Sequence, residues 1–147
     1  MMKNEDVFEE MTPQWALCLN GECPRSGECL RYQLCRQAPT GVTRWLCVLP
    51  TALNDGDCAY FRPAEKVRMA RGMNSIFRNV RNRQERQAIR LTLTRLLGSK
   101  GTYYRYKNGE RWIGPKLQQH IEAALRQNGL DGEVTFDYYE ETYDLTE

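Results

Sequence analysis

The sequence predicts one mainly α-helical domain, residues 1–147, and three observations predict it. The length of 147 residues is typical of a single domain. Three segments repeat apolar residues every three or four positions, which is the period of an amphipathic helix. Capping and turn residues bound these segments. The three helices are expected near residues 64–80, 83–97 and 115–128, within a basic helical core of residues 63–130.

The first 62 residues predict a loop-rich module instead of long helices. All six cysteines lie here, and glycine and proline residues interrupt the segment repeatedly. Only a short helix around Leu30 and Leu34 is expected. We expect this Cys-rich module, residues 1–62, to wrap on the helical core through Trp15, Trp45 and Leu46.

The first two helices of the core are predicted from apolar stripes and from their ends. Proline is compatible with a first helical turn, so Pro63 suits the start of the helix at 64–80. Asn82 and Glu85 form a capping box before the helix at 83–97, and Gly98 ends it. The apolar stripes are Val67, Ala70, Met73, Phe77 and Val80 in the first helix, and Ile89, Leu93, Leu96 and Leu97 in the second.

The rest of the chain divides into one ambiguous segment, one clear helix and an acidic end. Residues 102–113 suit either a helix or a hairpin that turns at Asn108-Gly109. The helix at 115–128 follows Pro115 and buries Leu117, Ile121, Ala124 and Leu125. The acidic tail, residues 131–147, alternates apolar residues near its start and predicts a short strand or an extended tail.

Charge is distributed unevenly along the chain, although the net charge is only +2. Residues 1–59 carry a net charge of −3, residues 60–120 carry +12, and residues 121–147 carry −7. Arginine accounts for 16 of the 21 basic residues, and its planar fork suits phosphate and guanine. A basic middle of this kind indicates a polyanion-binding surface. The alternative is a set of solvated helix faces that the acidic tail partly neutralises.

The cysteines favour a metal site made of thiolates. Cys18, Cys23 and Cys29 follow one another with Gly and Pro between them, which allows a loop to fold back on one ion. Cys58 follows a turn-like segment and supplies a fourth thiolate, whereas Cys35 and Cys47 lie in apolar surroundings typical of packing. We expect structural zinc on Cys18, Cys23, Cys29 and Cys58. The alternatives are an iron–sulfur cluster, or cysteines that bind no metal or form disulfides.

Several function classes find no support in the sequence. No apolar run approaches the roughly 18 residues of a membrane span. The N-terminus lacks the apolar core of a signal peptide, so a cytoplasmic location and no membrane partner are expected. The sequence has one histidine, His120, and it contains no phosphate-loop, zinc-protease or nucleophile-elbow motif. We therefore expect that the protein is not an enzyme.

Residues 96–129 resemble the helix-turn-helix headpieces of the lac and lambda repressor type. Leu96-Leu97-Gly98 resembles the end of the first helix, and Asn108-Gly109 the end of a short recognition helix. A further helix begins near Pro115 and ends before Gly129. The resemblance implies that the short helix faces DNA. If the segment were a hairpin, its basic residues would instead line a wing along the phosphates. Together the candidate nucleic-acid-binding residues are Lys100, Thr102, Tyr103, Arg105, Tyr106, Lys107 and Arg111.

The whole chain also resembles a family of small, Cys-rich bacterial proteins of unknown function. The shared features are Cys-x4-Cys-Pro-x4-Cys-Leu-Arg at 18–31, Cys58-x2-Phe61, the segment 103–111, and the closing residues 136–144. This resemblance supports the quartet Cys18, Cys23, Cys29 and Cys58, and implies no activity.

Two functions therefore remain as hypotheses. In the first, the protein binds double-stranded DNA, as a transcriptional regulator would, and carries a structural thiolate-metal site. In the second, it is an interaction module whose basic face docks an acidic protein partner without binding nucleic acid. The oligomeric state is not predicted.

Overall fold

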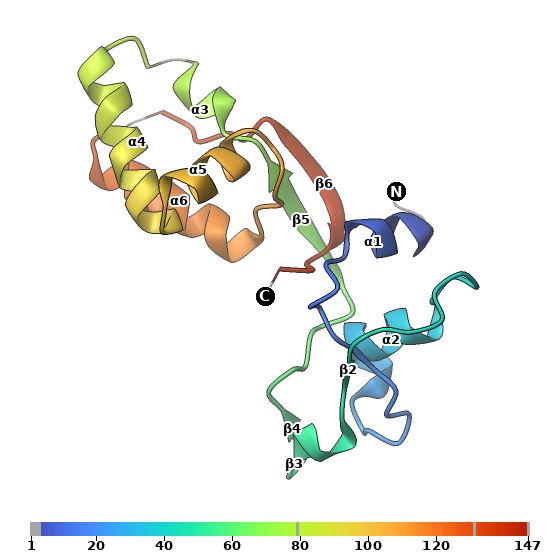
Figure 1. Cartoon of the computed structure of the whole chain (residues 1–147). Coiled ribbons are helices and arrows are strands. Elements are labelled where there is room, and N and C mark those ends of the chain that lie inside the picture. The colour runs from blue at the N-terminus through green and yellow to red at the C-terminus, as the bar shows by residue number, and fades with distance from the viewer. Residues whose placement is uncertain (1–3, 79, 131, 147) are drawn as a thin grey trace. The chain divides into compact units, whose positions relative to one another are not determined.

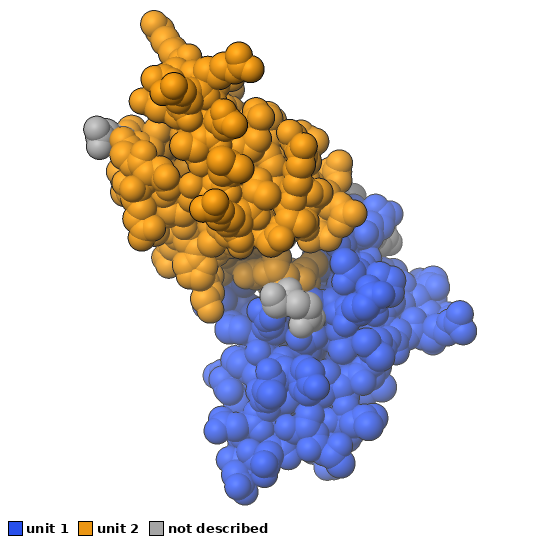
Figure 2. All heavy atoms as spheres, turned by 60° about the vertical axis from the view of Figure 1, so that its left-hand side comes forward, with its two compact units in different colours: residues 1–66, 147 blue, residues 67–146 orange. Residues whose placement is uncertain are grey.

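The structure, a computed structural model, describes residues 4–78, 80–130 and 132–146. The chain divides into two compact units, residues 1–66 with 147 and residues 67–146 (Figure 2). Within the described residues, 42% are helical and 17% are in strands, which form three small sheets. The prediction of a mainly α fold is therefore wrong, because the protein mixes α and β structure. None of the described helices has the length and apolar character that crossing a membrane requires.

Unit 1 is built from short elements joined by turns (Figure 1). They are α1 (Asn4–Glu10), β1 (Leu17–Cys18), the 3-10 turn η1 (Ser26–Glu28), α2 (Leu30–Arg36), β2 (Cys47–Val48), the 3-10 turn η2 (Pro50–Ala52), β3 (Leu53–Asn54) and β4 (Asp57–Cys58). Strand β1 pairs with β2 in parallel, with Leu17 opposite Cys47 and Cys18 opposite Val48. Strands β3 and β4 form an antiparallel hairpin. The turn of this hairpin is Asp55-Gly56, and both residues have positive φ, the usual requirement of a tight hairpin turn.

The core of unit 1 combines apolar side chains with one buried arginine. The buried apolar residues of this unit are Val7, Phe8, Met11, Trp15, Leu17, Leu30 and Leu34. Arg31 on α2 is only 2% exposed. Its Nε donates to the Tyr60 carbonyl at 2.6 Å and its Nη1 to the Ala16 carbonyl at 2.7 Å, while its guanidinium lies over the Trp15 ring. Arg31 thereby ties α2 to the segments on both sides of it.

Unit 2 packs helices against a two-stranded sheet (Figure 1). Its elements are β5 (Lys66–Arg71), α3 (Asn74–Phe77), α4 (Arg83–Leu97), α5 (Lys100–Lys107), α6 (Pro115–Gln127) and β6 (Tyr138–Tyr143). Helix α4 packs on both α5 and α6, and β5 pairs with β6. One continuous core joins β5 and the four helices: Ala70, Met73, Ile76, Phe77, Val80, Ile89, Leu93, Tyr103, Ile113, Ile121, Leu125 and Phe136.

The helix expected at residues 64–80 is the main error in the fold prediction. The segment forms strand β5, a turn at Gly72 and the short helix α3. Gly72 has a φ of +79°, which ends the strand, and a Cβ there would overlap the carboxyl group of Asp137. The apolar residues of the predicted stripe from Ala70 to Val80 are nevertheless buried. Their spacing suits an extended segment that pairs with distant β6 as well as it suits a helix.

The other predicted elements agree better with the structure. The helices expected at 83–97 and 115–128 are confirmed as α4 and α6. Asn82 caps α4 by accepting from the Gln84 N–H, and Gly98 ends it with a φ of +96°. The ambiguous segment 102–113 contains helix α5, not a hairpin. The acidic tail supplies β6 and the buried Phe136, so residues 132–146 contribute to the fold of unit 2.

Candidate functional site

A basic hollow lies in unit 2 between α3, α4 and the end of α5. It has a volume of about 290 Å³, and its lining residues are Asn74, Phe77, Arg78, Arg86, Arg90 and Lys107. A second hollow of about 390 Å³ shares two of these arginines and is lined by Arg83, Arg86, Gln87 and Arg90. Among the residues that the structure describes, no carboxylate lines either hollow. The arrangement offers several guanidinium groups to one anionic ligand.

Backbone hydrogen bonds hold the elements around the hollow in place. The Lys107 carbonyl accepts from the Met73 N–H at 3.0 Å and from the Asn74 side-chain amide at 3.3 Å, which fixes the end of α5 to α3. Arg86 on α4 donates to the Val80 carbonyl at 2.6 Å and to the Phe77 carbonyl at 2.8 Å. Arg86 is therefore a structural residue as well as a lining residue. Its guanidinium has further N–H groups beyond the two that make these bonds.

Two further groups lie near this region, the buried Tyr103 and the exposed Asp137. Burial raises the pKa of the Tyr103 hydroxyl, and the Arg90 guanidinium beside that hydroxyl offsets part of the rise. Asp137 caps α3 by accepting from the Ser75 N–H at 2.6 Å and from the Asn74 N–H at 3.1 Å. Burial alone would raise the pKa of Asp137, but these hydrogen bonds outweigh it and hold the pKa below its usual value. Asp137 does not line the hollow, but its carboxylate also accepts from the side-chain amide of Asn74, a lining residue, at 3.1 Å.

The nucleic-acid-binding residues predicted from the sequence do not form one surface. Tyr103 is fully buried in the core of unit 2. Tyr106 packs against the same core, and the Lys107 ammonium lies 5.5 Å from the centre of the Phe77 ring. Since Tyr103, Tyr106 and Lys107 share one helical face, the face that the sequence assigned to DNA is the inward face of α5. The aromatic residues that suggested readout are core residues.

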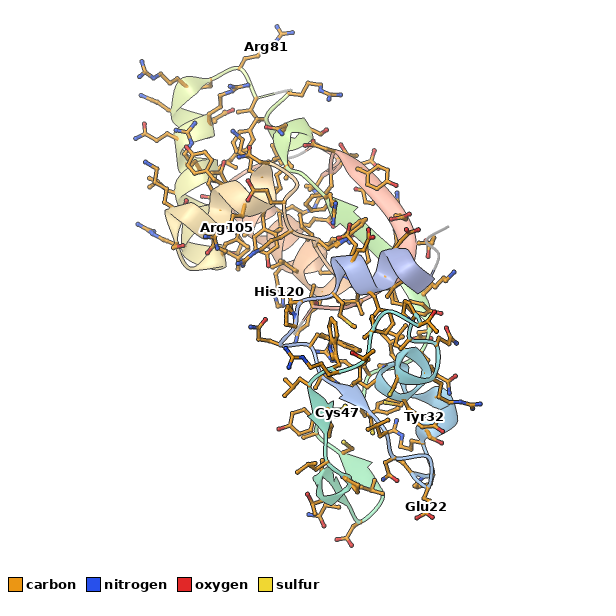
Figure 3. The ribbon with its side chains drawn as sticks, turned by 45° about the vertical axis from the view of Figure 1, so that its right-hand side comes forward. Glu22, Tyr32, Cys47, Arg81, Arg105 and His120 are labelled. Carbon is orange, nitrogen blue, oxygen red and sulfur yellow. The ribbon has the colours of Figure 1, made fainter. Side chains whose placement is uncertain are left out.

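The remaining predicted residues lie elsewhere on or near α5. Lys100 and Arg105 are exposed, and Thr102 is half-buried beside Ser99, which caps the helix. Arg105, labelled on α5 in Figure 3, points away from the Lys107 face, because residues two apart on a helix do not share a face. Arg111 is exposed, and its guanidinium is 5.9 Å from the centre of the Tyr106 ring. Of the predicted set, only Lys107 lines the hollow.

Sequence reasoning missed Asn74, Arg78, Arg86 and Arg90. Arg83, Arg86 and Arg90 follow a spacing of three and four residues, which places them on one face of α4. That spacing was a usable signal. Asn74 and Arg78 gave none, because their position depends on the turn at Gly72 and on α3, where a continuous helix was expected.

A second candidate site lies in unit 1, where the four predicted cysteines line one cavity. The cavity has a volume of about 30 Å³, and Cys18, Cys23, Cys29 and Cys58 all line it. All six cysteines of the chain are free and half-buried. As the side chains stand, no three His, Cys, Asp or Glu residues within the described ranges converge closely enough to hold a metal ion. The structure thus places the four predicted cysteines around one cavity, but their sulfur atoms do not converge on one metal position.

Cys35 and Cys47 do not line this cavity, although both lie near Cys18, which does. Burial, followed by the charges of Cys47 and Cys18, raises the pKa of the Cys35 thiol. The Cys47 thiol, labelled on β2 in Figure 3, donates to the Trp45 carbonyl at 3.6 Å. Both thiols therefore fit the packing role that the sequence indicates.

Comparison with known proteins gives the chain a family. The model of a family of unknown function, DUF6078, matches residues 1–145. The chain belongs to the DUF6078 family. No curated protein and no solved structure matches the chain. The DUF6078 match spans residues of both units.

Proposed function

We propose that the protein binds nucleic acid, double-stranded DNA in particular, through phosphate contacts made by the basic hollow of unit 2. The observation that carries the proposal is the lining of the two adjoining hollows, which holds Arg78, Arg83, Arg86, Arg90 and Lys107 and, within the described chain, no carboxylate. Phosphate oxygens are the ligands that clustered guanidinium groups bind best, often through two hydrogen bonds at once.

The helical spacing of the arginines supports a backbone ligand. A helix rises about 1.5 Å per residue, so Arg83 and Arg90 are separated by roughly 10 Å along α4. This span lets one helix face reach more than one phosphate of a strand. Among the described residues, no ion pair occupies Arg78, Arg83 or Arg90, so their charges are available to a ligand.

The lining also favours a duplex over a single strand. Proteins that hold single strands stack bases on exposed aromatic rings. The aromatic residue in the lining is Phe77, which is 7% exposed and belongs to the core. Phosphate contacts position a protein on DNA but carry no base readout. We therefore propose binding with little sequence preference through this surface.

Fluorescence anisotropy of the full chain with a random duplex at 50 and 200 mM salt tests the proposal. For about four phosphate contacts, affinity should fall roughly 100-fold between these salt concentrations. Arg78→Ala and Arg83→Ala should each weaken binding and lower the salt slope by about 1. Arg126→Ala is the matched control, since Arg126 lies on α6 and pairs with Glu122 at 3.0 Å.

The outcomes separate the two hypotheses. No binding at 50 mM salt would reject the proposal and leave the acidic protein partner as the better explanation. Equal losses for Arg83→Ala and Arg126→Ala would show that net charge, and not the hollow, attracts the duplex. Deleting the acidic tail is not a suitable test, because it would remove β6 and the buried Phe136.

A further inference from the structure

Three of the four cysteines around the cavity of unit 1 follow one another in the chain, and the fourth, Cys58, comes from a distant hairpin. Cys18 ends β1, Cys23 lies in the following loop, Cys29 precedes α2, and Cys58 ends the β3–β4 hairpin. The cavity that they line has a volume of about 30 Å³. The space between the four cysteines is therefore larger than the roughly 10–15 Å³ that one water molecule needs.

Backbone hydrogen bonds bring these segments together independently of the thiols. The Leu30 N–H donates to the Arg62 carbonyl at 2.7 Å, and the Ala64 N–H donates to the Glu28 carbonyl at 2.8 Å. These bonds hold the chain after Cys58 beside Cys29. The Asn20 N–H donates to the Cys18 sulfur at 3.4 Å. Contacts of this kind orient the ligands of a metal from outside the coordination sphere.

The charges around the cavity suit an anionic centre. Zinc held by four thiolates carries two negative charges. Arg25 and Arg31 both line the cavity. The Arg25 guanidinium lies 3.4 Å from the centre of the Phe61 ring, and two backbone carbonyls hold Arg31. Both cations are thus fixed beside the sulfurs.

The size of unit 1 gives a reason for a metal. Units below about 70–80 residues gain little stability from one apolar core and usually add disulfides or a metal. Unit 1 comprises about 66 residues, and its six cysteines are free.

We infer that Cys18, Cys23, Cys29 and Cys58 bind one structural zinc ion. Tetrahedral coordination at ~2.3 Å requires the four sulfurs to turn further into the cavity than they now lie. Binding therefore reorders the loop that carries Cys23 and draws the β3–β4 hairpin toward α2. The four thiols lose their protons to solvent as zinc binds, and metal binding stabilises unit 1. The inference is independent of nucleic-acid binding by unit 2.

A cobalt titration of the reduced full chain tests this inference. Co²⁺ in a site of four thiolates gives strong visible absorption, which should saturate at one equivalent and disappear when Zn²⁺ is added. Cys23→Ser and Cys29→Ser should weaken binding by at least roughly 10–100-fold. Cys35→Ser and Cys47→Ser are the matched controls and should leave binding unchanged.

The wild-type titration alone keeps the inference falsifiable if a variant does not fold. No thiolate–Co²⁺ absorption from the reduced wild-type chain would overturn it. An equal loss of binding in Cys35→Ser would overturn the assignment of the quartet. Iron and labile sulfide in the purified protein would show that the cysteines hold an iron–sulfur cluster and not zinc, and would overturn the inference. Disulfides among the four cysteines of protein made under reducing conditions would also contradict it.

Discussion

Units 1 and 2 contain similar numbers of residues but organise them differently. In unit 1 the strands are two residues long, and Arg31 lies among the buried side chains. In unit 2 the sheet has six-residue strands, α4 has fifteen residues, and one apolar core joins every element except β6, which packs through the half-buried Tyr139. Burial of apolar side chains therefore stabilises unit 2, whereas hydrogen bonds from a buried arginine and, as we infer, a metal ion stabilise unit 1. The two units should therefore respond to different substitutions.

Truncating the core of unit 2 should have the largest effect. Leu93 on α4 is fully buried, so Leu93→Ala removes apolar contacts and leaves a cavity. We expect a loss of about 3–4 kcal/mol in the free energy of unfolding. Urea unfolding measures the loss, and amide hydrogen exchange shows where it falls. An equal loss of amide protection in residues 4–65 would show that the two units are not stabilised separately.

The corresponding substitution in unit 1 removes a polar anchor. Arg31→Met leaves the carbonyls of Tyr60 and Ala16 without their donor, and we expect a loss of about 2–3 kcal/mol. Arg36→Met, at the exposed end of α2, is the control and should have little effect. Amide exchange in residues 15–62 measures both variants. If Arg31→Met were as stable as Arg36→Met, unit 1 would depend on its apolar core after all.

A smaller effect is expected where β5 turns into α3. Gly72→Ala places a Cβ against the Asp137 carboxyl group at a φ of +79°, and we expect a loss of about 2 kcal/mol. Gly129 has a similar φ of +84°, but a Cβ added there would have open space within 4 Å, so Gly129→Ala isolates the backbone strain, about 1 kcal/mol. Urea unfolding of the two variants compares them. Equal losses would show that the Asp137 contact adds nothing.

The smallest effect concerns the cap of α3 and depends on pH. The pKa of Asp137 is lower in the folded protein than in the unfolded chain, so its charge stabilises the fold above the unfolded pKa of about 3.9. This stabilisation is lost as pH falls through the lower folded pKa. Asp137→Asn should therefore cost at most about 1 kcal/mol at pH 7, because the amide keeps only one of the two acceptor oxygens. The gap between the two proteins should close below pH 4 in urea unfolding, and a constant gap would contradict the cap's charge dependence.

Local signals predicted part of the fold, and distant pairings account for what they missed. Asn82, Ile89, Leu93 and Gly98 determine α4 within one segment, and the helix is where they predict it. Residues 66–71 satisfy helical and extended spacing alike, and their state depends on pairing with residues 138–143. No local pattern carries that information.

The candidate sites follow the same rule. The four cysteines were predicted as a group because turns near each cysteine mark it locally. The structure places all four on one cavity, but as the described side chains stand it brings no three of them close enough to hold a metal ion. The basic hollow was not, because it assembles from α3, α4 and α5. Tyr103 is buried and Tyr106 packs against the core, which the sequence did not indicate, because on a short helix aromatic residues suit a core and a binding face equally.

The pairing of β5 with β6 also bears on the order of events during synthesis. The ribosome makes β5 before α3, α4, α5 and α6, and its partner strand only after all of them. While the chain emerges, the edge of β5 therefore stays unpaired and Phe136 is missing from the core. Unit 1 has its complete sequence long before that. Closing so long a loop is slow compared with forming local helices, so the basic helices are exposed to the cell before the acidic strand joins them.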